Sequence, residues 1–260
     1  MSTYIHGTQR REQERLAALN RLTNAAFLRF LDVPRGARVL EVGSGLGILA
    51  SDVASAADDV RVVGVERSRE QITSAVNDAR VGYVQADAHA LGFPDASFDL
   101  VYGRYILEHV ANPERVLGEM RRVTRAGGRV AVCENDITLF RVDPPCLTFE
   151  HVWQAFERYQ KSLGGDGLIG RRLFRLFRQA GFSRIELSVQ PEAHWHGSPE
   201  FSAWIQNLIG NIDSARQGLV AATFCNEAEI ETAIAELTAV GCDPNASSHF
   251  MWNRAVAFKD

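Results

Sequence analysis

The chain has 260 residues, 46% hydrophobic and 23% charged, with a formal net charge of −4, and these values are ordinary for a globular protein. Because there is no basic excess and no apolar run of about 18 residues, we expect neither a nucleic-acid partner nor a membrane span. No basic and apolar leader is recognisable and the four cysteines form no Cys-x-x-Cys pair, which favours a cytoplasmic protein with reduced thiols and without a zinc site.

A glycine-rich turn follows the first helix and the first strand of the sequence. Apolar residues recur at helical spacing over residues 16–31, and a short apolar run over residues 38–42 predicts a buried strand. Glycines then alternate with other residues over 43–47, before a helical pattern over 48–57. A strand, a glycine turn and a helix begin a βαβ unit, in which the N–H groups of the helix start face a ligand. We therefore predict a nucleotide-like ligand over the turn.

The next strand ends on an acidic residue. Residues 61–65 are apolar, and Glu66 follows about 20 positions after the glycine turn. A carboxylate at the carboxyl end of the second strand can accept both hydroxyls of a ribose. The spacing Gly-x-Gly-x-Gly differs from the dinucleotide pattern Gly-x-Gly-x-x-Gly, which argues against a nicotinamide cofactor.

The rest of the chain continues the alternation of strands and helices. Apolar runs and helical spacing predict strands at 81–85, 98–102, 129–134, 185–189 and 249–258, and helices at 69–79, from Pro113, and at 149–163, 171–180 and 227–240. Residues 191–226 are the least regular part. Because strands and helices alternate, the sequence predicts an α/β fold with its ligand at the carboxyl ends of the strands.

Five successive motifs resemble those of class I S-adenosylmethionine (SAM) dependent methyltransferases. They are Glu41-Val-Gly-Ser-Gly-Leu-Gly47, Glu66, Gln85 to Asp99, Tyr102 to Pro113 and Leu117 to Val130. The ubiquinone and menaquinone methyltransferases are the most similar branch, and the resemblance is strong over residues 36–135. It implies a doubly wound sheet of seven strands with the last strand antiparallel, a helical cap, and SAM as cofactor.

The resemblance also implies a set of cofactor-binding residues. Glu66 would hold the ribose, Asp87 the exocyclic amine of adenine, Ala88 a ring nitrogen, and the Arg104 backbone would lie beside the methionine part. The expected set is Glu41, Gly43, Ser44, Gly45, Glu66, Arg67, Asp87, Ala88 and Arg104. Asp87 has an alternative role, in which its side chain only caps the following turn.

The acceptor half of the site is expected in the less regular segments. By the resemblance, residues 1–35 form a helical lid, residues 36–190 and 249–260 the SAM-binding core, and residues 191–248 an insertion in the substrate cap. The expected acceptor-binding residues are Tyr4, Asp136, Trp195, His196 and Trp204. As alternatives to acceptor binding, the aromatic residues can simply pack in the core and Asp136 can cap a turn. His194 and His196 lack a third ligand nearby, so no metal site is expected.

The proposed reaction is methyl transfer from SAM to an oxygen, nitrogen or carbon of a small molecule. A base is needed only if the acceptor must lose a proton, and the candidates are His109, His6, His194 and Glu108. Glu108 and His109 can equally hold their loop. Two other functions stay open: an NAD-dependent oxidoreductase and a non-catalytic SAM-binding module. The sequence predicts neither the acceptor nor the oligomeric state.

Overall fold

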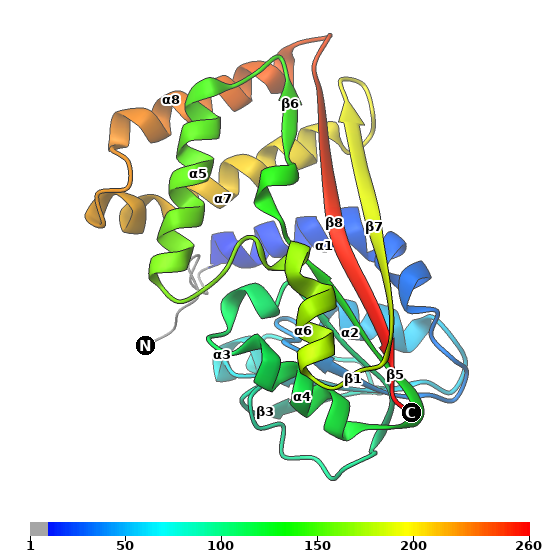
Figure 1. Ribbon diagram of the computed structural model, residues 1–260. Coiled ribbons are helices and arrows are strands. Elements are labelled where there is room, and N and C mark those ends of the chain that lie inside the picture. The colour runs from blue at the N-terminus through cyan, green and yellow to red at the C-terminus, as the bar shows by residue number, and fades with distance from the viewer. Residues whose placement is uncertain (1–9) are drawn as a thin grey trace. The chain divides into compact units, whose positions relative to one another are not determined.

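The computed structural model describes residues 10–260, with side chains from Gln13 onward (Figure 1). Contacts divide the chain into two compact units. One unit contains the described residues up to Leu22 together with Asp136–Leu168 and Pro191–Trp252, and the other contains Thr23–Asn135, Ile169–Gln190 and Asn253–Asp260. The predicted division into a lid, a core and a cap stays a prediction.

The second unit contains a parallel sheet in the order β3-β2-β1-β4-β5. The strands are β1 (Arg38–Val42), β2 (Arg61–Glu66), β3 (Val81–Gln85), β4 (Phe98–Arg104) and β5 (Thr124–Glu134). The last strand, β8 (Ser247–Phe258), pairs antiparallel with β5 over Asn253–Phe258, and β7 (Arg184–Trp195) pairs with β8. The expected doubly wound sheet with an antiparallel last strand is confirmed.

One strand was missing from the prediction. A three-residue strand, β6 (Arg141–Asp143), pairs with the first residues of β8 and brings the sheet to eight strands. A three-residue strand carries too little periodicity to be recognised in the sequence, because alternation is visible only over about four residues or more.

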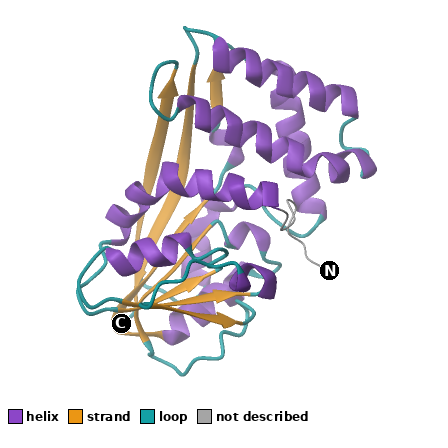
Figure 2. Cartoon of the chain, turned by 180° about the vertical axis from the view of Figure 1, so that it is seen from behind, coloured by secondary structure: helices purple, strands orange, loops and turns teal. Residues whose placement is uncertain are grey.

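Helices cover the sheet of the second unit, as expected for a doubly wound fold. They are the end of α1 (Arg10–Leu31), α2 (Ile48–Ser55), α3 (Arg69–Thr73), η1 (Leu107–His109), α4 (Pro113–Val123), η3 (Ile169–Arg172) and α6 (Leu173–Gln179). Leu117 and Met120 of α4 and Phe177 of α6 join Val101 and Val130 of the strands in one buried core. In Figure 1 α4 and α6 lie in front of these strands, and Figure 2 shows the opposite side.

Helix α3 is shorter than predicted. It ends at Thr73 and not near Ala79, and the amide of Val76 donates to the carbonyl oxygen of Leu46 instead of continuing the helix. Its start was predicted correctly, because the Ser68 side chain accepts a hydrogen bond from the Gln71 amide. The stop was not, because a long-range backbone bond competes with the local helical one.

The first unit consists mainly of three helices and the outer ends of β7 and β8. The helices α5 (Leu147–Ser162), α7 (Phe201–Ala221) and α8 (Glu227–Cys242) pack together, next to the short η2 (Ile137–Leu139). Asn226 and Glu229 form a capping box at the start of α8. Within the described chain, none of the helices combines the length and apolar composition that crossing a bilayer requires.

The prediction of an irregular segment over residues 191–226 was wrong for α7. This helix has 21 residues, and its buried side chains recur every three or four positions from Phe201 to Leu219. Gly210 and Gly218 lower its intrinsic helix propensity. Burial of the apolar face against α5 and α8 outweighs that cost, and such packing cannot be read from one segment.

Candidate active site

The glycine turn after β1 has the backbone conformation that requires glycine. Gly43, Gly45 and Gly47 have φ values of 79°, 51° and 68°. The amides of Gly43 and Ser44 both donate to the carbonyl oxygen of Val65 at the end of β2, at 2.8 and 2.9 Å. A Cβ atom at Gly47 would lie 2.0 Å from the Tyr83 hydroxyl. The turn is therefore held close to β2 and leaves no room for a side chain at position 47.

Glu66 lies at the carboxyl end of β2 and binds two backbone amides. Its Oε2 accepts a hydrogen bond from Gly45 at 3.1 Å, and its Oε1 accepts one from Ser68 at 2.8 Å. The carboxylate is thereby fixed between the glycine turn and the start of α3. Since each carboxylate oxygen has a further lone pair, Glu66 can still accept two ligand hydroxyls.

Glu41 is a buried carboxyl group next to the same turn. It is 3% exposed, and among residues 10–260 its Oε2 has no hydrogen-bond partner. Burial raises the pKa of Glu41 to about 8, although the Arg104 guanidinium acts in the opposite direction. The Ser44 hydroxyl, also buried, lacks a partner in the same described region. Because a buried polar atom without a hydrogen-bond partner destabilises the folded state, Glu41 and Ser44 are suited to binding the charged groups of a ligand.

Arg104, at the end of β4, is bound by the second half of α1. Its guanidinium donates to Thr23 Oγ1 at 3.1 Å and to Asn24 Oδ1 at 2.7 Å, and lies over the Phe27 ring. The Asn24 amide donates in turn to Asp52 of α2. Residues Thr23 and Asn24 were not identified from the sequence. Their one sequence signal is a polar pair within the apolar pattern of α1.

Asp87 caps the turn that follows β3. Its Oδ1 accepts hydrogen bonds from the backbone amide and from the ring Nδ1 of His89, at 2.8 and 2.7 Å. The hydrogen bond from the backbone amide is the main cause of the lowered pKa of Asp87. The capping role that was the alternative is thus present. The Asp87 side chain is nevertheless 57% exposed, so it can also meet a ligand. Arg67 and Ala88 lie beside it, Arg67 exposed and Ala88 half-buried.

A cluster of buried carboxyl groups lies at the carboxyl ends of β4 and β5. Glu134, fully buried, accepts hydrogen bonds from the amides of Ile106, Leu107 and Glu108 at 3.1, 2.8 and 3.4 Å. Burial, and next the charge of Glu108, raise the pKa of Glu134 well above its usual value. Glu134 therefore fixes the short helix η1 that carries Glu108 and His109. Its role was not predicted.

Glu108 and His109 lie close to each other on η1. Glu108 is 4% exposed, and its Oε1 accepts a hydrogen bond from the Asn135 side chain at 2.6 Å. The same oxygen is 3.8 Å from Nε2 of His109. Tyr105, which lies two residues before η1, has a φ of 56°, and this value is strained for a residue with a side chain. The His109 imidazole therefore lies beside a carboxylate that the Asn135 side chain holds in place.

The remaining predicted residues belong to the first unit or lie outside the described residues. The His194 ring stacks on Trp204 at 4.9 Å between centroids, and the two side chains are 7% and 2% exposed. Burial lowers the pKa of His194. Both residues therefore belong to the core of this unit, which is the packing alternative. Tyr4 and His6 precede the described residues.

Asp136, Trp195 and His196 differ from one another in burial. Asp136 is 3% exposed and caps η2 by accepting a hydrogen bond from the Thr138 amide at 3.1 Å. Trp195 is 58% exposed at the end of β7, and His196 is exposed next to it. Among the residues that the structure describes, no group of three or more His, Cys, Asp or Glu side chains can hold a metal ion.

Comparison with known proteins identifies the family of this chain. Residues 40–132 match the family model of a methyltransferase domain. An O-methyltransferase of Aspergillus nomiae is 31% identical over 199 residues, which are 72% of this chain and 84% of that protein. A demethylmenaquinone methyltransferase of Clavibacter sepedonicus is 34% identical over 193 residues, 72% of this chain and 71% of that protein. Two other curated relatives are matched over only 47% and 63% of their lengths.

A solved structure shows the same fold. Phosphoethanolamine N-methyltransferase 2 of Haemonchus contortus, in complex with SAM, is 21% identical, with a TM-score of 0.53. The match covers 95% of this chain and 52% of that one. Together with the glycine turn and Glu66, the two relatives above establish the family. The chain belongs to the class I SAM-dependent methyltransferases.

Proposed function

We propose that this protein transfers a methyl group from SAM to an oxygen, nitrogen or carbon atom of a small molecule. The observation that carries the proposal is Glu66, a carboxylate fixed at the end of β2 by the glycine turn and by Ser68. Family membership supports it, and the names of two relatives, an O-methyltransferase and a demethylmenaquinone methyltransferase, favour small acceptors.

The described residues fit the cofactor. Glu66 would accept the ribose hydroxyls, Asp87 the adenine amine, and Glu41 the ammonium group of the methionine part. The unpartnered Oε2 of Glu41 is the observation that supports this last assignment. When bound, SAM supplies a methyl group on a sulfonium ion, whose leaving group is a neutral thioether. The protein then has to position the acceptor and exclude water.

Glu108 and His109 are the favoured pair for taking a proton from the acceptor. They lie at the carboxyl end of β4, on the edge of the sheet where open α/β folds bind their ligands. The Glu108 carboxylate is fixed by the hydrogen bond that it accepts from the Asn135 side chain, and the His109 ring lies next to it. His194 is a weaker candidate, because its ring is buried against Trp204.

The raised pKa of Glu41 predicts a pH-dependent affinity for SAM. Below about pH 8 the free protein holds a proton on Glu41, and an ammonium group favours the ionised form. Binding therefore releases a proton, and the affinity for SAM should rise between pH 6.5 and 8 by up to about tenfold per pH unit. Calorimetry in buffers of different ionisation enthalpy measures the proton release. The variant Glu41→Gln should show a flat profile, and an equally steep one would refute the assignment.

The Glu41 carboxyl group should also make the free protein less stable as the pH rises. The folded state keeps the proton up to about pH 8, whereas the unfolded state releases it near 4.5. The free energy of unfolding should therefore fall with rising pH between those values, by at most about 1.4 kcal/mol per unit from Glu41. Urea unfolding at several pH values, compared with Glu41→Gln, isolates this contribution.

Replacing His109 by alanine should lower kcat by about 10²–10³-fold for an acceptor that loses its proton during transfer. The KM for SAM should change little, since His109 is not among the expected cofactor contacts. Glu108→Gln should lower kcat less and shift its pH profile, because the amide keeps a hydrogen-bonding group beside His109. Unchanged kcat in both variants, with a phenol acceptor, would assign the pair to holding the loop.

The proposal is tested by titrating the purified protein with SAM, S-adenosylhomocysteine and NAD, followed by transfer of a labelled methyl group to a panel of quinols, phenols and amines. Micromolar binding of the first two compounds and methylation of an acceptor are the expected results. Binding of NAD alone would favour an oxidoreductase. Binding of SAM without transfer to any acceptor of the panel would favour a non-catalytic SAM-binding module.

A further inference from the structure

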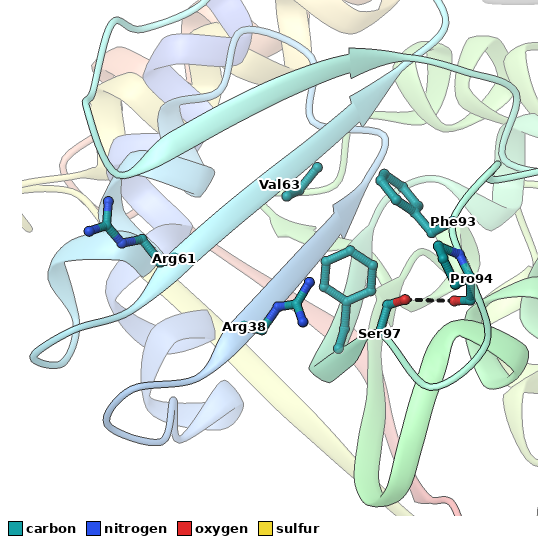
Figure 3. A pocket seen from close by; sticks show the side chains of 7 residues that line it. Arg38, Arg61, Val63, Phe93, Pro94 and Ser97 are labelled. Atoms are coloured by element: carbon teal, nitrogen blue, oxygen red, sulfur yellow. Dashed lines mark hydrogen bonds between the residues drawn. The ribbon is translucent and has the colours of Figure 1, made fainter.

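A cavity lies at the amino ends of β1 and β2, away from the candidate active site (Figure 3). Its volume is about 340 Å³, at the lower end of the range of small-molecule pockets. Its lining consists of Arg38, Arg61, Val63, Phe93, Pro94, Ser97 and Phe98. All of these residues belong to the second unit, so the cavity depends on no other part of the chain.

The apolar part of the cavity is a rigid wall. The rings of Phe93 and Phe98 meet edge to face, with centroids 5.1 Å apart and planes at 88°. The Ser97 hydroxyl donates to the carbonyl oxygen of Pro94 at 2.7 Å, which fixes the segment between the two rings (Figure 3). With half-buried Val63, the two rings form an apolar lining on which an aromatic ring can pack face on or edge on.

The charged part consists of two arginines without anionic partners. Arg38 and Arg61 are direct neighbours across β1 and β2, and within residues 10–260 neither guanidinium forms an ion pair or a hydrogen bond. The Arg38 guanidinium carbon is 5.9 Å from the Phe98 ring centroid. Figure 3 shows the two guanidinium groups turned away from each other. Like charges directly opposite in a sheet are destabilising, and a bound anion would relieve this repulsion.

The acidic residues beside the cavity are engaged elsewhere. The Asp99 side chain accepts a hydrogen bond from the backbone amide of Arg38 at 2.6 Å and forms an ion pair with Arg125. Asp95 forms an ion pair with Arg122 at 2.8 Å. Neither of these carboxylates therefore forms an ion pair with Arg38 or Arg61. The site combines an aromatic wall with two arginine side chains that form no ion pair within the described part of the chain.

We propose that this cavity is a second binding site, for a small oxyanion that carries an aromatic ring. The ring would pack on Phe93, Phe98 and Val63, and the carboxylate or phosphate would bind the Arg38 guanidinium, whose planar fork matches either group. Arg61, at the rim, can turn its side chain over the anion. The five residues of β1 separate this site from the glycine turn by about 15 Å, so SAM and the anion can bind together.

The test uses the full-length protein and calorimetric titration with 1-naphthoate, 1-naphthyl phosphate, inorganic phosphate and neutral 1-naphthalenemethanol. We expect both aromatic anions to bind more tightly than either the neutral alcohol or phosphate. Binding should be unchanged by saturating S-adenosylhomocysteine. Arg38→Gln should weaken it about tenfold or more, and Arg61→Gln less, since the loss is that of a charge-assisted hydrogen bond.

Two further variants complete the test. Val63→Phe should fill the cavity and abolish binding, while Arg35→Gln, which breaks an exposed ion pair with Asp58, should leave it unchanged. The proposal is overturned if the neutral alcohol binds as tightly as the anions, if S-adenosylhomocysteine displaces them, or if Arg38→Gln binds as the natural protein does. If Val63→Phe does not fold, the comparison of Arg38→Gln with Arg35→Gln decides.

Discussion

Replacing Glu66 by alanine should weaken the binding of SAM by about 100-fold or more. In the proposed function this carboxylate accepts the two ribose hydroxyls, and hydrogen bonds to a charged group contribute about 1.5–3 kcal/mol each. The variant also removes the acceptor of the Gly45 and Ser68 amides, so the glycine turn loses its connection to α3. Isothermal titration with SAM and S-adenosylhomocysteine measures the loss.

Two comparisons separate cofactor binding from a general effect on the fold. Glu66→Gln keeps one oxygen and should bind SAM with an affinity between those of the natural protein and Glu66→Ala. Glu186→Ala removes an exposed carboxylate of β7 and should bind SAM normally. If Glu66→Ala binds SAM as tightly as Glu186→Ala does, the assignment of the ribose site is wrong.

Replacing Glu134 by alanine should lower the free energy of unfolding by roughly 3–5 kcal/mol. Three amides, of Ile106, Leu107 and Glu108, would lose their acceptor in a buried environment, and each unsatisfied buried group costs about 1–3 kcal/mol before water enters the cavity. Equilibrium unfolding in urea, followed by circular dichroism, measures the change. A loss below about 1 kcal/mol would mean that these amides find other partners.

Glu134→Gln is the matched control for this prediction. The amide has the same shape and keeps one acceptor oxygen, so it should lose less stability than alanine. Because burial and the charge of Glu108 raise the pKa of Glu134, ionisation of Glu134 at high pH costs folding free energy. The stability of the natural protein should therefore fall as the pH rises from the unfolded-state pKa of 4.5 towards this raised value, and that contribution should be absent in Glu134→Gln.

The glycine turn and the position of Glu66 at a strand end were predictable because their signals are local. The glycine turn depends on three residues whose positive φ values exclude most side chains. Glu66 ends the next strand, at the expected sequence distance from this turn. The strands β1 to β5 were each visible as apolar runs between turns. The family motifs then provided candidate roles for the residues between them, and relatives of more than 30% identity establish the family.

Other features required the folded chain. Glu134 ends a strand and looks in sequence like any other acidic strand end, but in the structure it binds the amides of η1, from 26 to 28 residues earlier. Arg104 similarly binds Thr23 and Asn24, which are separated from it by about 80 residues. Hydrogen bonds over such separations leave no periodicity, because they depend on where strands and helices meet.

The sequence alone was sufficient for the class of fold, the family resemblance, the glycine turn and the acidic residue that faces it. These depend on backbone conformation and on apolar spacing within short segments. The partners of Arg104, the buried state of Glu41, the amides bound by Glu134 and the pairing of β6 were decided by packing. Burial and long-range hydrogen bonds arise only when separate elements come together, and for that reason the ionisation of Glu41 and Glu134 could be assessed only in the folded structure.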